Sequence, residues 1–176
     1  MKNKVVLFVL MLYGLLFSAS GFASQEENKL MAVFFGRFAS YIELPDRAAT
    51  QFVITLVDEN PFGSLLDDLY RGKLIGGKPV AIRHASRVED IGQSDMLFIT
   101  LVNPRTRQDA IDYATKNSIL TISTAMGFAE RGGIIQLDFL QQHTRIKINH
   151  AAAVKSNIRI GAALLSVATV IRGEKP

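Results

Sequence analysis

The hydrophobic positions fall into short runs separated by polar turns, a pattern that predicts alternating strands and helices. The runs at 52–57 and 96–101 are apolar at nearly every position and rich in β-branched residues, which is typical of strands covered on both faces. The expected strands are 52–57, 79–83, 96–101 and 119–123.

Two asparagine–proline pairs mark the beginnings of helices between these strands. Asn60-Pro61 and Asn103-Pro104 each supply a capping side chain followed by a proline suited to the first helical position. They predict one helix over 62–70 and another over 104–116, the second with Ala110, Ile111 and Ala114 facing inward. Strands that alternate with helices predict an α/β fold, here a three-layer sandwich whose mostly parallel central sheet is flanked by helices.

An earlier helix carries more apolar side chains than one face needs. From Asn28 to the Leu44-Pro45 pair, apolar residues recur every three or four positions, and the proline ends the helix. These residues are Leu30, Met31, Val33, Phe34, Phe35, Phe38, Tyr41 and Ile42. The aromatic residues indicate either a helix buried against the sheet, which we favour, or a partner surface.

The stretch 127–168 organises the C-terminal part of the chain. Ile135, Leu137 and Phe139 alternate with polar residues, and so do Ile146 and Ile148, which predicts an antiparallel hairpin at an edge of the sheet with one wet face. Asparagines should begin and end the short helix that follows. The expected order is a cap at Asn149, a helix over 151–155, a left-handed stop at Asn157, a strand from Ile158 to Ile160 and a last helix from Leu164 through Ile171.

The first 23 residues have the three-part pattern of a secretory signal peptide. Lys2 and Lys4 precede an apolar run from Val5 to Phe17, and small residues follow as far as Ala23, where we expect cleavage. The run is shorter than the ~20 residues of a membrane-spanning helix. We therefore expect an exported, periplasmic protein whose residues 24–176 form one domain; an uncleaved anchor is the alternative.

Composition narrows the classes of function. The chain has no cysteine, which excludes a lipoprotein anchor, disulfides, thiol chemistry and thiolate metal sites. Removing residues 1–23 takes away two lysines from 20 basic residues and none of the 16 acidic ones, which leaves 18 against 16 and a formal charge of +2. That balance argues against binding nucleic acid, which requires a concentrated basic face.

No group of residues has the spacing of a catalytic or metal site. The segment from Gly72 to Pro79 nearly matches a phosphate-binding loop, but Pro79 replaces the hydroxyl residue and the loop follows a helix, so we expect a turn. The histidines His84, His143 and His150 lack metal-ligand spacing, and no serine lies in a nucleophile motif. We therefore expect a protein that is not an enzyme and that binds neither a cofactor nor a metal ion.

Two neighbouring stretches are candidates for binding. Ser123 and Thr124 follow a strand of the parallel sheet, where small ligands collect in such folds, and form a candidate ligand pocket. In the next loop, Phe128 lies among glycines and charges, which indicates either a protein anchor or a plug for the end of the sheet. Its candidate polar rim consists of Glu130, Arg131, Arg145 and Lys147.

A series of short motifs runs from residue 28 to residue 172, and their order and spacing are more specific than any one motif. The C-terminal motifs are Gly127-Phe128, Gly132-Gly133-Ile134-Ile135, Ile148-Asn149, Ala152-Ala153, and Leu164-Leu165 with Ala168. Earlier ones are Phe34, Phe38 and Tyr41-Ile42-Glu43 before Pro45, then Asn60-Pro61-Phe62-Gly63 and Gly77-Lys78-Pro79-Val80. In these motifs the chain resembles the YfiR-like family of small periplasmic regulators. Leu44 stands where the family usually has tryptophan, Gly161-Ala162 replaces a Ser-Ser pair, and the cysteines that members often carry near the Gly-Phe turn are absent.

The resemblance implies a protein that acts by binding. It implies repression of an inner-membrane diguanylate cyclase through that enzyme's periplasmic sensor region, and so control of cyclic-di-GMP synthesis and biofilm formation. An OmpA-like outer-membrane lipoprotein would relieve the repression, and a homodimer is a further candidate assembly. The rival hypothesis is a periplasmic small-ligand-binding module that serves a sensor kinase or an uptake system. A structural envelope protein is a third hypothesis.

Overall fold

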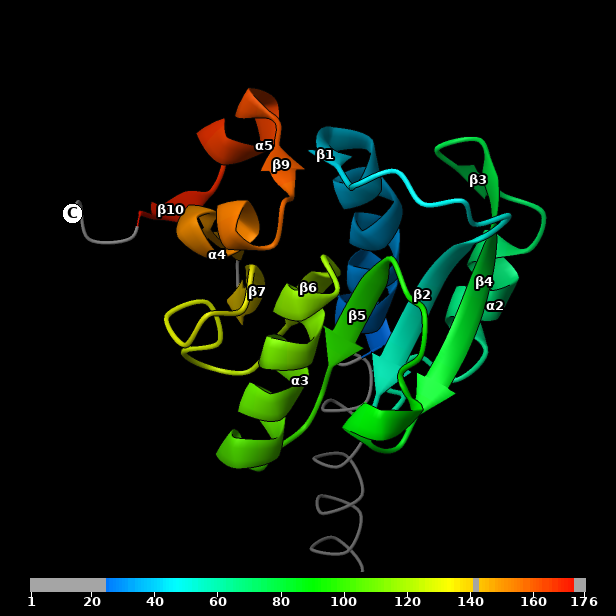
Figure 1. Ribbon diagram of the computed structural model, residues 1–176, viewed down its shortest axis with the longest axis horizontal. Coiled ribbons are helices and arrows are strands. Elements are labelled where there is room, and N and C mark those ends of the chain that lie inside the picture. Colours follow the sequence, from blue (N-terminus) through cyan, green and yellow to red (C-terminus); the bar gives the residue numbers. More distant parts are fainter. Residues whose placement is uncertain (1–24, 141–142, 173–176) are drawn as a thin grey trace, which may run out of the picture.

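The computed structural model describes residues 25–140 and 143–172, so the predicted signal peptide lies outside the described residues. Its centre is a curled sheet made of β2 (Phe52–Val57), β3 (Leu74–Ile75), β4 (Lys78–Ala85), β5 (Met96–Ile99), β6 (Leu120–Ser123), β7 (Ile135–Leu140), β8 (His143–Asn149) and β10 (Thr169–Ile171). The strand order is β10-β8-β7-β6-β5-β2-β4-β3. Five of the neighbouring pairs are parallel: β10-β8, β7-β6, β6-β5, β5-β2 and β2-β4. Figure 1 shows this sheet with α3 in front and the blue helix of residues 25–41 behind. The predicted three-layer α/β fold is confirmed.

The helices are short apart from two. Beside the helix of residues 25–41 they are α2 (Leu65–Tyr70), α3 (Pro104–Lys116), α4 (His150–Lys155), α5 (Ala162–Ser166) and the 3-10 turn η1 (Val88–Asp90). A separate antiparallel pair, β1 (Ile42–Glu43) with β9 (Arg159–Ile160), joins the end of the first helix to the C-terminal part of the chain.

Side chains of the sheet alternate between two apolar clusters. Ile54, Leu56 and Phe98 point toward the helix of residues 25–41 and α2, whereas Leu97 and Ile99 point toward α3. Because both faces are covered, the central strands are apolar at consecutive positions, as predicted. The Asn103 side chain accepts hydrogen bonds from the amides of residues 105 and 106, so the predicted cap of α3 is confirmed.

The first helix buries only part of its apolar surface. It buries Met31, Ala32, Phe35 and Phe38, whereas Leu30, Val33 and Tyr41 are 41%, 44% and 46% exposed. The Phe35 ring lies 5.5 Å from the rings of both Phe62 and Phe98, and these contacts select the buried face. Eight apolar positions cover most of the circumference of the helix, so their spacing alone did not identify that face.

The helix after the first asparagine–proline pair begins later than predicted. The Asn60 side-chain oxygen Oδ1 accepts the Phe62 backbone amide at 2.9 Å, and the side-chain nitrogen Nδ2 donates to the Gly63 carbonyl at 2.9 Å. These bonds close a turn, and α2 begins only at Leu65. The segment from Gly72 to Pro79 contains the expected turn at Gly76 and Gly77, with φ of 57° and 78°, but the residues on either side of it pair as β3 and β4.

The C-terminal region confirms the hairpin and corrects its surroundings. β7 pairs antiparallel with β8, placing Ile135 opposite Ile148. The hairpin is not at the edge, however, because β10 pairs in parallel with β8 outside it. The predicted last helix ends at Ser166, and residues 169–171 form β10 instead. The left-handed stop at Asn157 (φ 55°) and the Asn149 cap, which accepts the Ala152 amide at 2.9 Å, are both confirmed.

Candidate functional site

The turn of residues 124–133 joins β6 to β7 and positions Phe128. The Phe128 ring is 0% exposed and belongs to the apolar cluster under α3. A Cβ atom at Gly133 would lie 2.1 Å from the Phe128 Cε1 atom, so only glycine leaves room for the ring. The prediction of Phe128 as a partner anchor is therefore wrong, and the alternative, a plug beside the sheet, is what the structure shows.

Two polar side chains fasten this turn to the hairpin. The carbonyl oxygen of the Gln136 side chain accepts the Ala129 amide at 3.2 Å, and the Asn149 side chain donates to the Ala129 carbonyl at 2.7 Å. Gln136 is 1% exposed, so its hydrogen bonds replace those that it would make with water. Asn149 thus caps α4 and also holds the turn, a second role that its position in the sequence did not reveal.

A charged network lies on the polar face of the hairpin, beside the turn. The Lys147 ammonium is 2.9 Å from Glu130 Oε1 and 3.7 Å from Asp138 Oδ2, and the Gln136 amide nitrogen donates to Asp138 Oδ1 at 2.6 Å. The hydrogen bond with Lys147 holds the pKa of Glu130 below its usual value, and the same bond raises the pKa of Lys147. Both groups are therefore charged at neutral pH.

The structure brings together some of the predicted rim residues and separates others. Glu130 and Lys147 form an ion pair, and Arg145 lies two residues before Lys147, so it shares the wet face of β8. Arg131 instead folds back over the beginning of the turn, where its Nη1 donates to the Met126 carbonyl at 3.1 Å. Asp138 and Gln136 were missed as site residues, although their alternation with apolar residues in β7 placed them on the same face.

The predicted ligand pocket at Ser123 and Thr124 gains little support from the contacts of Ser123. The Ser123 hydroxyl is buried, donates to the Ile99 carbonyl at 2.6 Å and accepts the Ala125 amide at 3.1 Å. We therefore assign Ser123 to the connection between β5 and the turn. The Thr124 side chain is exposed.

Residues 25–140 and 143–172 contain neither a metal-binding cluster nor a membrane-spanning helix. In those ranges no three His, Cys, Asp or Glu side chains are arranged to hold a metal ion. No helix in the same ranges combines the length and the apolar character needed to cross a membrane.

Fold and site together define an α/β domain with a charged surface beside a buried turn. Residues 28–169 match the YfiR/HmsC-like family, and the chain belongs to that family. The family consists of periplasmic, regulatory and non-catalytic proteins of cyclic-di-GMP cyclase systems.

Solved structures show what the fold is similar to. A conserved domain protein from Vibrio cholerae O1 biovar El Tor strain N16961 aligns with a TM-score of 0.54 at 16% identity, over 81% of this chain and 59% of that chain. The ABC domain in complex with L-Trp from Streptococcus pneumonia aligns with a TM-score of 0.49 at 12% identity, over 68% of this chain and 55% of that one. This chain thus spans less than two thirds of either protein. No curated protein matches its sequence.

Proposed function

We propose that this protein represses an inner-membrane diguanylate cyclase by binding that enzyme's periplasmic sensor region. The observation that carries the proposal is the family match over residues 28–169. The proposal includes export with cleavage near Ala23 and a single domain over residues 24–176. Repression would lower cyclic-di-GMP synthesis and so limit biofilm formation.

The surface that we assign to the cyclase consists of Glu130, Arg131, Arg145 and Lys147, and is called the docking rim here. Phe128 is excluded from it because its ring is buried. The Glu130–Lys147 pair is already formed in the free chain, which reduces the entropy lost when a partner binds. Arg131 and Arg145 are exposed, and planar guanidinium groups suit carboxylates on a partner.

Relief of repression would come from a second protein that competes for this chain. We propose an OmpA-like outer-membrane lipoprotein for that role, because the motifs that this chain shares with the YfiR-like family imply such an antagonist. Its binding would remove the chain from the cyclase without any chemical change in either protein.

The test compares charge reversals on and off the docking rim in cells that lack the chromosomal gene. Deleting the gene should raise cyclic-di-GMP, and the wild-type chain should lower it again. The double variant Arg131→Glu, Arg145→Glu should fail to do so, because reversed charges at an interface repel the partner. The purified variant should bind the cyclase's periplasmic region at least about tenfold more weakly.

The matched control is Arg83→Glu. Arg83 is an exposed arginine on β4, near the opposite edge of the sheet from the docking rim. The Arg83→Glu variant should repress the cyclase as well as the wild type does when both are present at equal periplasmic abundance. Unchanged cyclic-di-GMP after gene deletion would refute the function itself, whereas full repression by the double variant would refute only the docking rim.

A further inference from the structure

A groove lies beside the Glu130–Lys147 ion pair, between elements distant in sequence. It is walled by α3, residues 130–132 of the turn, α4 as far as its last residue Lys155, the end of β10 and Arg172. Its volume of about 490 Å³ falls in the range of small-molecule sites. Ile111, Gly132, Ala152 and Ile171 give the groove a partly apolar lining.

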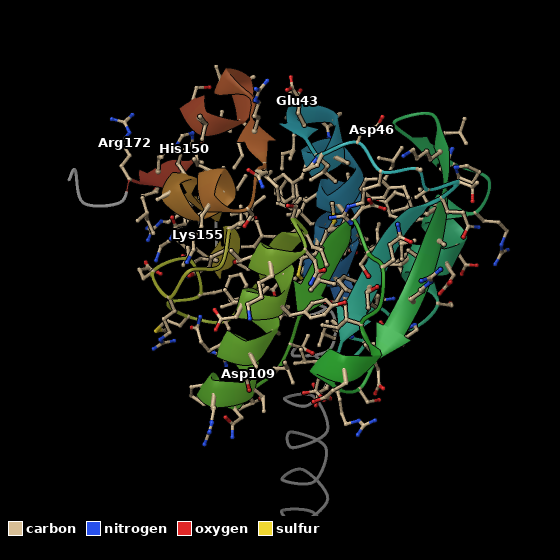
Figure 2. The ribbon with its side chains drawn as sticks, viewed as in Figure 1. Glu43, Asp46, Asp109, His150, Lys155 and Arg172 are labelled. Carbon is tan, nitrogen blue, oxygen red and sulfur yellow. The ribbon has the colours of Figure 1, made fainter. Side chains whose placement is uncertain are left out.

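Cationic side chains gather at this groove. Arg131, Lys155 and Arg172 all line it and all are exposed. In Figure 2, Lys155 and Arg172 lie on the side of the molecule that carries α4 and β10, and the Arg172 side chain points outward. Among the residues that the structure describes, none of the three takes part in an ion pair.

The two carboxylates of the groove do not offset these charges. Glu130 already binds Lys147 at 2.9 Å, and Asp112 accepts the Gln108 amide at 3.0 Å. Arg131, Lys155 and Arg172 carry three positive charges, and Asp112 is the one groove carboxylate that is not paired with a lysine. The groove therefore has an excess of positive charge. Such a surface raises the local concentration of anions.

We propose that this groove binds a small organic anion, a phosphate or carboxylate carried on an apolar body. The guanidinium groups of Arg131 and Arg172 supply paired donors that match either anion, and Lys155 supplies a third positive charge. The Nη1 bond to Met126 already restrains Arg131 and leaves its other N–H groups to bind the ligand. The lining residues Ile111 and Ile171 suit an apolar body of a few carbon atoms. The inference does not require the proposed cyclase partner, although Arg131 belongs to both the groove and the docking rim.

The experiment titrates the purified chain with matched probes and follows amide resonances by NMR. Phenyl phosphate and benzoate carry the two anions, phenol and benzamide are their neutral counterparts, and inorganic phosphate lacks the apolar body. We expect saturable binding of at least one organic anion with a Kd of about 1 mM or below. The amides of Gly132 and Ala152 should shift, and neutral probes should bind at least about tenfold more weakly.

Charge-removing variants locate the binding. Arg131→Gln, Lys155→Gln and Arg172→Gln should each weaken the organic anion several-fold, whereas Arg83→Gln should not. All four side chains are on the surface, so equal melting temperatures should verify the fold. Binding of phenyl phosphate alone or of benzoate alone would support the proposal and identify the anion. It would be overturned by no saturable binding, by equal affinity for inorganic phosphate, or by affinity unchanged in all three groove variants.

Discussion

Phe128 shows how a neighbouring glycine decides where a ring lies. Glycines on both sides of an aromatic residue indicate an exposed loop when only the sequence is considered. In the structure, the missing Cβ of Gly133 instead provides the space that the ring occupies, and Ala129 is held from both sides by Gln136 and Asn149. The turn is therefore part of the core, and the docking rim beside it is charged rather than aromatic.

Phe128→Ala tests this assignment directly. Removing a fully buried ring should lower the free energy of unfolding by about 3–5 kcal/mol, since a cavity remains under α3. Urea denaturation measures the change. Met126→Ala, two residues away at 87% exposure, is the matched control and should change stability by less than about 0.5 kcal/mol. A stable Phe128→Ala protein would restore the anchor hypothesis.

At the scale of elements, a tyrosine links α2 to the first helix. The Tyr70 hydroxyl donates to the Ala32 carbonyl at 2.7 Å and accepts the Gly36 amide at 2.6 Å. These two backbone groups are separated by four residues and would bond to each other in an uninterrupted helix. A Cβ at Gly36 would lie 2.9 Å from the Tyr70 oxygen, so glycine permits the approach. The hydroxyl thus bridges one turn of the helix that covers the sheet.

Tyr70→Phe should lower the free energy of unfolding by about 1 kcal/mol near neutral pH. The loss is modest because the Ala32 and Gly36 groups can bond to each other once the hydroxyl is gone. Chemical denaturation measures it, with Tyr113→Phe as the control, since the Tyr113 hydroxyl makes a single exposed bond to Gly92. A loss of several kcal/mol would mean that the Gly36 amide and the Ala32 carbonyl do not bond to each other when the hydroxyl is absent.

The same substitution changes how stability depends on pH. Burial raises the pKa of Tyr70 above its ordinary value of 10.0, so the fold favours the neutral phenol. That contribution is fully present below pH 10.0 and is lost as the pH rises through the raised value. The wild type should therefore lose stability above pH 10.0 more steeply than Tyr70→Phe. Parallel curves for the two proteins would contradict the raised pKa.

At the scale of the whole molecule, Arg47 joins three segments that are distant in sequence. Its guanidinium donates to the carbonyls of Ser94, Asn117 and Ser118, and lies 3.8 Å from Asp95. The loop after the first helix is thereby bound to the beginnings of β5 and β6. The side chain is 19% exposed, so most of it is shielded from water.

Arg47→Ala should lower the free energy of unfolding by about 2–3 kcal/mol, because the partly buried carbonyls of Ser94 and Ser118 lose a charged donor. Thermal and urea denaturation measure the change. Arg47→Lys keeps the charge but offers one nitrogen where the guanidinium offers a planar fork, so it should recover less than half of the loss. Equal stability of the alanine variant and the wild type would show that water replaces all three bonds.

The sequence by itself determined the elements that local chemistry specifies. The buried strands were visible as apolar runs, because a strand covered on both faces must be apolar at consecutive positions. Asn103, Asn149 and Asn157 marked helix ends because caps and left-handed stops depend on a single side chain. The order of these elements was sufficient to predict the three-layer fold.

Only the tertiary structure decided which apolar side chains are buried and that residues 169–171 pair with β8 as a final strand. The face of the first helix depends on the rings of Phe62 and Phe98, and residues 169–171 form a strand because β8 offers them an unpaired edge. Phe128 is buried because Gly133 lies against it, and Arg131, Lys155 and Arg172 share a groove although they come from three elements. These features arise from contacts between residues far apart in the chain, which local patterns do not encode.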